Sequence, residues 1–281
     1  MCSQDMNRTA EVLTVVSDML ALPLPYLDVP SLPLPLGLSI HPFGVCAALG
    51  AYVGARLVVT AARVYEPGEN RALTGVVVWA LVGGMLGAHL LHVLGYHPEL
   101  LRSQGPWALL KVWDGVSSMG GVLGGLVGIL LFFRIHRLPI RSYWDALALG
   151  AAPGWAIARI GCAMVHDHPG IRSDAWFAAA FPDGPRLDMG LIDCVLLATL
   201  SIVLWLLARR RWRPGFLMGV LAVGYCLPRF FLDFFRARDL AFVDGRFAGL
   251  TPAQWVTPVL ALAGVYLLDP GGPLRGEARS S

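Results

Sequence analysis

Long apolar runs recur along this chain of 281 residues and limit the folds that it can adopt. A helix needs about 20 mostly apolar residues to cross the hydrocarbon core of a bilayer. Runs of that order lie at about residues 36–60, 75–96, 116–133, 143–164, 190–208, 215–235 and 252–268. Since a bilayer satisfies no backbone polar group, a spanning chain must be helical or a closed barrel. The runs predict an all-α polytopic membrane protein with about seven transmembrane helices.

Composition supports this class, because 56% of the residues are hydrophobic and only 15% are charged. Soluble domains carry about 25% charged residues. One very large soluble core is the alternative, and repeated runs of this length argue against it. We therefore expect an N-terminal segment (1–35), a membrane domain (36–268) and a short tail (269–281). A polar insertion (166–188) interrupts the membrane domain after the fourth run.

Arginines gather after the first, third, fifth and seventh runs. They are Arg56, Arg63, Arg71, Arg134, Arg137, Arg141, Arg209, Arg210, Arg211, Arg213, Arg275 and Arg279. The opposite connections carry fewer arginines. Because short basic loops face the cytoplasm, the tail is expected inside, and the N-terminal segment and the insertion outside.

Four pairs of glycines are spaced four residues apart within the apolar runs. They are Gly50 and Gly54, Gly83 and Gly87, Gly120 and Gly124, and Gly150 and Gly154. Small residues at this spacing let membrane helices approach closely, so we expect these glycines at helix contacts. Gly120 and Gly121 also follow a polar stretch at the start of the third run, which makes them candidates for a site on the outer side.

Two arginines, Arg159 and Arg229, lie inside apolar runs. A charged side chain at the bilayer centre costs at least about 2.5–3.5 kcal/mol, so it is seldom without a function. Arg229, Asp233 and Arg236 fall on one helix face. They either form an ion-pair ladder that stabilises the bundle, or Asp233 orients Arg229 toward an anion. Arginine binds phosphate oxygens in pairs, and the second arginine favours this anion site.

A metal site is a weaker hypothesis. His166, Asp167 and His168 form a short polar motif, and His89 and His92 are further potential ligands. Hydrogen-bonded core histidines explain His89 and His92 more simply, so we expect no metal ion and no other cofactor. The chain has no phosphate-binding loop, no nucleotide fingerprint and no serine nucleophile elbow, and no basic surface suited to nucleic acid.

Over residues 40–268 the chain resembles the bacterial prolipoprotein diacylglyceryl transferases. The resemblance rests on motifs in order. Their residues are His41, Pro42, Phe43, Gly44, Val112, Trp113, Asp114, Gly115, Gly120, Gly121, Asp145, Arg159, Ile160, Gly161, Asp167, Gly170, Arg186, Asp188, Gly190, Leu191, Asp193, Gly224, Tyr225, Arg229, Asp233, Phe234, Phe235, Arg236 and Gln254. The family has seven spans, an outside N-terminus and an outer insertion after the fourth span, which agrees with the topology above.

The resemblance implies transfer of the diacylglyceryl group from phosphatidylglycerol to a cysteine thiol in a prolipoprotein signal peptide, with release of glycerol-1-phosphate, in the bacterial inner membrane. The implied catalytic residues are Arg229, Arg159, Asp167 and His166. The implied substrate-binding residues are Arg159, Gly161, Gly170, His41, Phe43, Asp114, Gly120, Gly121, Asp233, Arg236 and Gln254.

The chain departs from the family pattern at several of these places. Met119 stands where the family has a histidine, and Cys162 and Val165 replace the two asparagines of its signature. Asp167 replaces a glutamate, and Phe43 a tyrosine. These departures leave a second interpretation open, a relative that binds anionic phospholipid or signal peptide without turnover.

Overall fold

The computed structural model describes residues 24–33, 35, 39–65, 73–112, 115–240 and 246–269. The N-terminal segment up to residue 23, the candidate Asp114, Arg71 and the tail from residue 270 lie outside the described residues. Five helical segments are long and apolar enough to cross a membrane: Pro42–Val64, Gly75–Tyr96, Ile140–Val165, Met189–Leu207 and Phe216–Phe235. Two apolar helices, Gly120–Ile135 and Pro252–Leu268, are shorter. The prediction of a polytopic helical membrane protein is confirmed.

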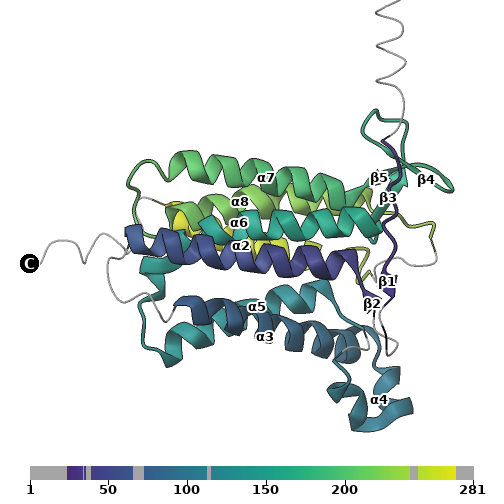
Figure 1. The fold of residues 1–281 in the computed structure, drawn as a ribbon, viewed down its shortest axis with the longest axis horizontal. Helices are drawn as coiled ribbons and strands as arrows, with labels where there is room; N and C mark the ends of the chain where they lie inside the picture. Colours follow the sequence, from purple (N-terminus) through teal and green to yellow (C-terminus); the bar gives the residue numbers. More distant parts are fainter. Residues whose placement is uncertain are drawn as a thin grey trace, which may run out of the picture.

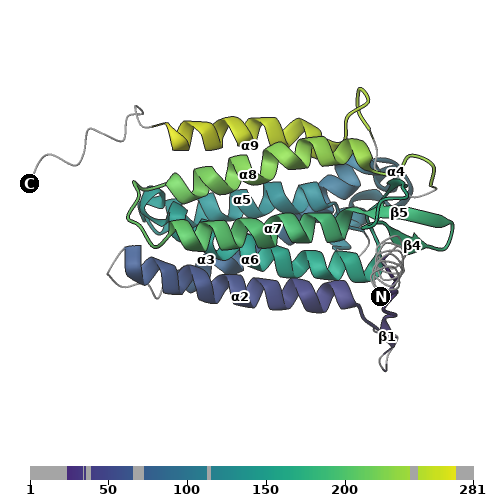
Figure 2. The same ribbon diagram turned by 90° about the horizontal axis from the view of Figure 1, so that it is seen from above.

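The helices follow the predicted runs closely. They are α2 (Pro42–Tyr65), α3 (Leu73–Leu91) with η3 (His92–Tyr96), α4 (Glu99–Gln104), η4 (Gly105–Leu110), α5 (Ser118–Ile135), α6 (Ile140–Val165), α7 (Met189–Leu207), α8 (Phe216–Leu232) with η5 (Asp233–Phe235), and α9 (Pro252–Leu268). The long helices run side by side, with α4 and the strands at one end (Figures 1 and 2). Helix α2 begins later than expected because Pro42, which lacks an N–H donor, suits the first helical position.

Glycines set the closest helix contacts, as the spacing predicts. A Cβ atom on Gly50 of α2 would lie 2.2 Å from the carbonyl oxygen of Gly154 on α6. A Cβ atom on Gly124 of α5 would lie 2.2 Å from the carbonyl oxygen of Gly83 on α3. The backbones of α2 and α6, and of α3 and α5, therefore touch directly.

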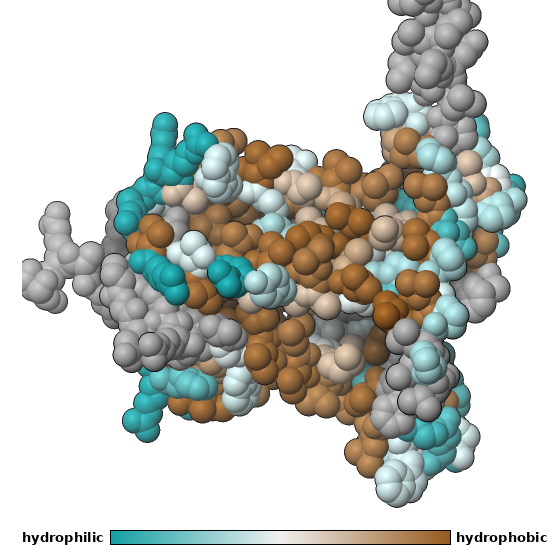
Figure 3. Space-filling model, viewed as in Figure 1, coloured by the Kyte–Doolittle hydropathy of each residue, from teal (hydrophilic) through white to brown (hydrophobic). Residues whose placement is uncertain are grey.

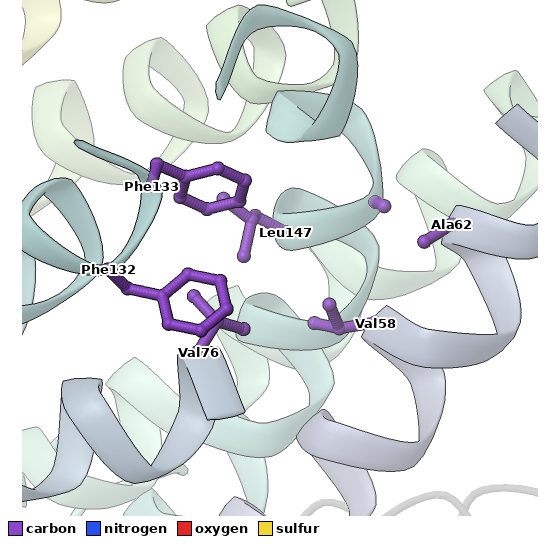
Figure 4. Close-up of a cluster of buried hydrophobic side chains, with 7 residues drawn as sticks. Val58, Ala62, Val76, Phe132, Phe133 and Leu147 are labelled. Atoms are coloured by element: carbon purple, nitrogen blue, oxygen red, sulfur yellow. The ribbon is translucent and has the colours of Figure 1, made fainter. Parts of the chain in front are cut away.

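A buried apolar cluster joins the two helix pairs at the end opposite the strands. Val58 comes from α2, Val76 from α3, Phe132 and Phe133 from α5, and Leu147 from α6 (Figure 4). The Phe132 and Phe133 rings meet edge to face, with centroids 5.4 Å apart. These contacts fix α3 and α5 against the rest of the bundle.

Asp145 of α6 holds the start of α8. Its carboxylate accepts hydrogen bonds from the backbone N–H groups of Gly215, Leu217 and Met218, at 3.1, 2.8 and 3.3 Å. The residue at the helix start, Gly215, has no side chain with which to cap these groups. The buried Asp145 thus satisfies donors that would otherwise be unpaired in an apolar interior.

The insertion is not helical, which corrects the all-α prediction in one detail. Strands β3 (Pro169–Arg172), β4 (Ala179–Phe181) and β5 (Gly184–Asp188) form an antiparallel sheet in the order β3-β5-β4. Two residues each of β1 (Leu32–Pro33) and β2 (Ser39–Ile40) form another pair. These strands are too short and mixed in polarity for the sequence to show a period of two.

The outer surface of the bundle is apolar where lipid would contact it. Large side chains such as Val259 and Leu262 are 65% and 71% exposed. Figure 3 shows hydrophobic residues along the middle of the visible face and hydrophilic residues toward both ends. This distribution fits a membrane-embedded bundle.

Candidate active site

Two arginines and two aspartates form a buried network at the end of the bundle that carries the β3-β5-β4 sheet. The members of this arginine–aspartate network are Arg159 of α6, Asp193 of α7, Arg229 of α8 and Asp233 of η5. Arg229 Nη1 donates to Asp193 Oδ2 at 2.9 Å, and Arg229 Nη2 lies 2.8 Å from Asp233 Oδ1. Arg159 Nη2 lies 3.5 Å from the same Asp193 oxygen. The predicted pairing of Arg229 with Asp233 is present.

Arg159 is less fully satisfied than Arg229. Its buried Nε has no hydrogen-bond partner among the described residues, and its Nη1 donates to the Cys162 sulfur at 3.6 Å. Arg229, in contrast, has a carboxylate oxygen against each terminal nitrogen. Because sulfur is a weak acceptor, Arg159 can turn donors toward the oxygens of an anionic ligand.

Helix α9 supports the network. The Thr251 hydroxyl donates a short hydrogen bond to Asp233 Oδ2. Thr251 and Gln254 form a reciprocal capping box at the start of α9, and Gln254 Nε2 donates to the Phe230 carbonyl oxygen at 3.1 Å. Both polar groups of the candidate Gln254 are thus used to cap α9 and to tie it to α8.

A turn at the end of α6 builds a second group beside the network. His166 has a left-handed backbone (φ 49°, ψ 36°), which reverses the chain after α6. Asp167 and His168 consequently lie over Cys162 of the last turns of α6. One ligand atom from each of these three residues lies within 4.8 Å of the others. We call this group the Cys–Asp–His cluster.

The surroundings of this turn shift two pKa values. Burial raises the pKa of Asp167 to about 6, an effect that the positive charge of Arg159 opposes. Burial together with Arg236 and Arg159 lowers the pKa of His168 to about 3. His168 is therefore neutral near pH 7, and Asp167 is largely ionised but close to its pKa.

His166 points away from the cluster and pairs with the insertion. Its Nδ1 lies 2.7 Å from Asp188 Oδ2, and its buried Nε2 has no partner among the described residues. The Tyr26 ring stacks on the imidazole with centroids 3.9 Å apart, and Phe181 meets it edge to face. Asp188 also caps α7 by accepting from Leu191 N at 3.0 Å. A histidine that is paired with an aspartate through Nδ1 and has no hydrogen-bond partner at Nε2 has the arrangement of a general base.

Arg236 is positioned differently from the prediction. Helix α8 ends at Leu232 and a 3₁₀ turn follows, so Arg236 has an extended backbone and does not continue the helix face. Its Nη2 lies 3.2 Å from His168 Nδ1, and its backbone bridges to Gly170. Arg236 therefore joins the Cys–Asp–His cluster through the insertion sheet.

The candidate glycines differ in how closely other atoms approach them. A Cβ on Gly161 would come within 2.8 Å of Phe43 Cα, and one on Gly170 within 2.8 Å of Leu187 Cβ. Gly120 and Gly121 lie on α5 against α3, and Gly120 is the more crowded of the two. A Cβ on Gly120 would lie 2.3 Å from the Gly87 carbonyl oxygen.

His41 and Phe43, at the start of α2, lie apart from the network's side chains. His41 is exposed, and its Nε2 lies 3.0 Å from the Ser39 hydroxyl. The Phe43 side chain is also exposed, whereas its backbone packs against Gly161. The structure therefore brings Phe43 to the site through its backbone.

The histidines of the second run stand apart from the cluster. His89 is buried, and its two ring nitrogens lie 3.1 and 2.8 Å from the carbonyl oxygens of Gly115 and Ala108. The interpretation of His89 as a hydrogen-bonded core histidine is confirmed. The His92 ring instead meets the His97 ring, with centroids 4.6 Å apart.

Two residues of the site have no role assigned from the sequence. Asp193 is an acidic residue at the start of an apolar run, a setting that resembles an ordinary helix cap. Cys162 resembles a core thiol, because the chain reversal at His166 is not visible in the sequence. The structure places both beside Arg159.

Comparison with known proteins shows the family of this chain. Residues 32–269 match the model of the family described as prolipoprotein diacylglyceryl transferase. The chain is similar to proteins named phosphatidylglycerol–prolipoprotein diacylglyceryl transferase. The protein of Brucella anthropi is 31% identical over 72% of this chain and 74% of its own. The protein of Brucella ovis is 32% identical over 72% of this chain and 74% of its own. The protein of Rhizobium leguminosarum bv. trifolii is 28% identical over 91% of this chain and 94% of its own. The chain belongs to the prolipoprotein diacylglyceryl transferase family.

Proposed function

We propose that this protein transfers the diacylglyceryl group of phosphatidylglycerol to the lipobox cysteine thiol of prolipoproteins and releases glycerol-1-phosphate. The observation that carries the proposal is the arginine–aspartate network, because it places two guanidinium groups beside one shared carboxylate in an apolar bundle. Family membership supplies the substrate class. Phosphatidylglycerol, the prolipoprotein signal peptide and the bilayer are the proposed partners, and nucleic acid is not one.

The proposed topology has seven spans, formed by α2, α3 and α5–α9, in the bacterial inner membrane. The N-terminal segment (1–35) and the insertion (166–188) lie outside, and the tail (269–281) is cytoplasmic. Arg63, Arg134 and Arg211 support this orientation, since they belong to the end opposite the network. The network then opens toward the outer leaflet.

In the proposed reaction the acceptor sulfur attacks the glyceryl carbon that carries the phosphate ester. A C–S bond forms and the C–O bond breaks, so the oxygen and both bonding electrons leave with glycerol-1-phosphate. Negative charge accumulates on the departing phosphate. Arg159 and Arg229 stabilise this charge, and in a site with little water such donors are worth more than in bulk solvent.

The acceptor thiol must lose its proton to become a nucleophile. Asp167 is the first proposed base, because it lies beside Cys162 and Arg159 and its side chain is 39% exposed. The His166–Asp188 pair is the second, since in the neutral tautomer that carries its proton on Nδ1, facing Asp188, Nε2 has a lone pair that can accept a proton. The proton passes from either group to water.

The remaining proposed substrate contacts come from the family motifs. Asp233 orients Arg229, and Arg236 lies at the rim. The others are His41, Phe43, Asp114, Gly120, Gly121, Gly161, Gly170 and Gln254. The packing described above supports a role in which Gly161 and Gly170 shape the site through the backbone, and Gln254 does so by tying α9 to α8 through its side chain.

A relative that binds phospholipid without turnover is the second candidate. Met119 in place of the family histidine favours it. Purified protein incubated with phosphatidylglycerol and a lipobox peptide distinguishes the two: release of glycerol-1-phosphate above that of an Arg159→Gln variant supports the transferase. Lipid binding without release, at every pH tried, supports the binding protein.

A further inference from the structure

We infer that the Cys–Asp–His cluster is a binding site for a single divalent cation of the zinc class. Cys162, Asp167 and His168 offer a thiolate, a carboxylate and an imidazole, which together suit Zn²⁺, Cd²⁺ or Co²⁺. Ca²⁺ and Mg²⁺ require a set of oxygen ligands, which these residues do not provide. The site adjoins the arginine–aspartate network, since Arg159 Nη1 lies 3.6 Å from the Cys162 sulfur.

The geometry is close to that of a three-ligand site. Zn²⁺ binds sulfur at about 2.3 Å and nitrogen or oxygen at about 2.0–2.2 Å, so ligand atoms of a tetrahedral site lie roughly 3.3–3.8 Å apart. The three ligand atoms here are within 4.8 Å of one another. Side-chain rotations that bring them about 1 Å closer complete three corners of a tetrahedron and leave the fourth open.

The chain reversal at His166 makes this arrangement possible. A helix that continued past Val165 would carry Asp167 and His168 beyond the last turn of α6. The left-handed backbone of His166 instead returns both residues to Cys162. Cys162 is 4% exposed, so the sulfur lies in a dry part of the site, while the partly exposed Asp167 gives a cation access from outside.

Neighbouring groups prepare the ligands. His168 Nδ1 lies 2.8 Å from the backbone oxygen of Asp167. A histidine that binds a metal ion through one ring nitrogen commonly donates the N–H of the other to a carbonyl oxygen. With the proton on Nδ1, Nε2 has a free lone pair. With the proton on Nε2, Nδ1 instead accepts from Arg236 at 3.2 Å, a contact that a bound cation would replace.

The positive charges of Arg159 and Arg236 disfavour a bound cation, and Asp193 partly neutralises the charge of Arg159. Arg159 Nη1 is 3.6 Å from the Cys162 sulfur, where it stabilises the thiolate that a metal ion needs. The Arg159 charge is balanced in turn by Asp193. Binding therefore competes with the guanidinium contacts of Arg159 and Arg236, and we expect a site that fills in the presence of added cation and empties with a chelator.

The test uses purified full-length protein in detergent, reduced with a phosphine and titrated with Cd²⁺. We expect an ultraviolet charge-transfer band of one cadmium–thiolate bond, saturating at one ion per chain and removed by chelator. Cys162→Ser should abolish the band, and Cys226→Ala, which removes a buried thiol from α8, should leave it unchanged. His168→Asn should weaken binding at least as much as the roughly 10–100-fold that loss of an outer-shell partner costs.

A band that persists in Cys162→Ser, or no band in the folded native protein at millimolar Cd²⁺, overturns the site. If Cys162→Ser does not fold, Cys162→Asn, which restores the asparagine of the family signature, takes its place. Helical circular dichroism and a monodisperse elution profile serve as the folding criteria.

The consequence for activity rests on the proposed function. A cation held by Asp167 removes a proposed base, so Zn²⁺ should inhibit the transferase and chelator should restore it. The two proposals fail separately. A cadmium band without transferase activity would support the cation site and reject the proposed transferase. Transferase activity without a cadmium band would support the transferase and reject the cation site.

Discussion

Asp193 and Arg229 join α7 to α8 through a 2.9 Å hydrogen-bonded ion pair in which the carboxylate is fully buried. The same carboxylate oxygen lies 3.5 Å from Arg159 of α6. Asp193 therefore fixes the separation of two guanidinium groups that come from different helices. The geometry of the proposed phosphate site depends on a residue that need not contact the phosphate.

Replacing Asp193 with asparagine should destabilise the protein strongly. Two buried guanidinium groups would lose a shared counter-charge, and removing one partner of a buried ion pair costs about 3–5 kcal/mol. We expect a lower midpoint of thermal unfolding in detergent. Asp174→Asn, an exposed change in the insertion, is the matched control. An Asp193→Asn midpoint equal to that of the control would contradict a role for Asp193 in holding the helices.

Lysine should not replace either arginine. A lysine keeps the charge of Arg159 or Arg229 but lacks the planar pair of donors. Loss of one such donor should raise the transition-state barrier by about 2.7–4 kcal/mol, which lowers the rate roughly 10²–10³-fold. The measurement is the kcat for glycerol-1-phosphate release, with Arg102→Lys on α4 as the control. A wild-type kcat in both lysine variants would place the phosphate elsewhere.

Much of the fold could be predicted because hydrophobic length is a local property. Each apolar run forms a helix, and the glycine spacing predicts close helix contacts, which the structure forms between Gly50 and Gly154 and between Gly83 and Gly124. The sheet of the insertion could not be predicted, because its strands are held by pairing between Pro169 and Asp188, which are distant in sequence.

A site residue could be predicted from the sequence where burying its charge in an apolar segment costs free energy. Arg159 and Arg229 are such residues, since an apolar run makes a charge conspicuous. Cys162 and Asp193 are ordinary residues for the segments in which they lie. Cys162 gains its partners from the turn at His166, and Asp193 gains Arg229 from the packing of α7 against α8. The predicted position of Arg236 was wrong because α8 ends one turn before the helix periodicity would carry it.

Cysteine labelling should reveal opposite sides for the two ends of the bundle. In a variant without native cysteines, Asp174→Cys in the insertion should react with an impermeant maleimide in intact cells. Arg211→Cys, after α7, should react only once the cells are opened. The arginine-rich connections are the reason for this expectation. Labelling of Arg211→Cys in intact cells would reverse the proposed orientation.

Gly120 and Gly121 should respond oppositely to alanine. A Cβ on Gly120 would meet the Gly87 oxygen at 2.3 Å, and such overpacking costs about 1–3 kcal/mol. The nearest described atoms to a Cβ on Gly121 would lie 3.8 Å away, and alanine favours a helix over glycine by about 0.8–1.0 kcal/mol. Thermal unfolding should show a lower midpoint for Gly120→Ala alone. Equal midpoints would contradict the close approach of α3 and α5.

With no histidine directly before Gly120, Asp167 and His166 replace the missing base only in part, so the rate should follow the ionisation of the acceptor thiol. A positioned base contributes about 10²–10⁴-fold, but a few per cent of a free thiol is already ionised near pH 7. The free thiol has a pKa of about 8.5, so its thiolate fraction rises as the pH approaches that value. We expect slow transfer at neutral pH, an increase as the pH rises, and a plateau above the thiol pKa.

Inserting a histidine between Met119 and Gly120 tests this explanation. The insertion falls in the first turn of α5, so the residues from Ser117 to Met119 shift by one position if Gly120 and later residues keep their register against Gly87 and Ala88 of α3. The rate at neutral pH should rise and the pH profile should flatten, because a histidine accepts protons below the thiol pKa. An inserted alanine is the control for the added length. A native protein that binds phosphatidylglycerol yet forms no product up to alkaline pH would reject the transferase and leave the lipid-binding protein.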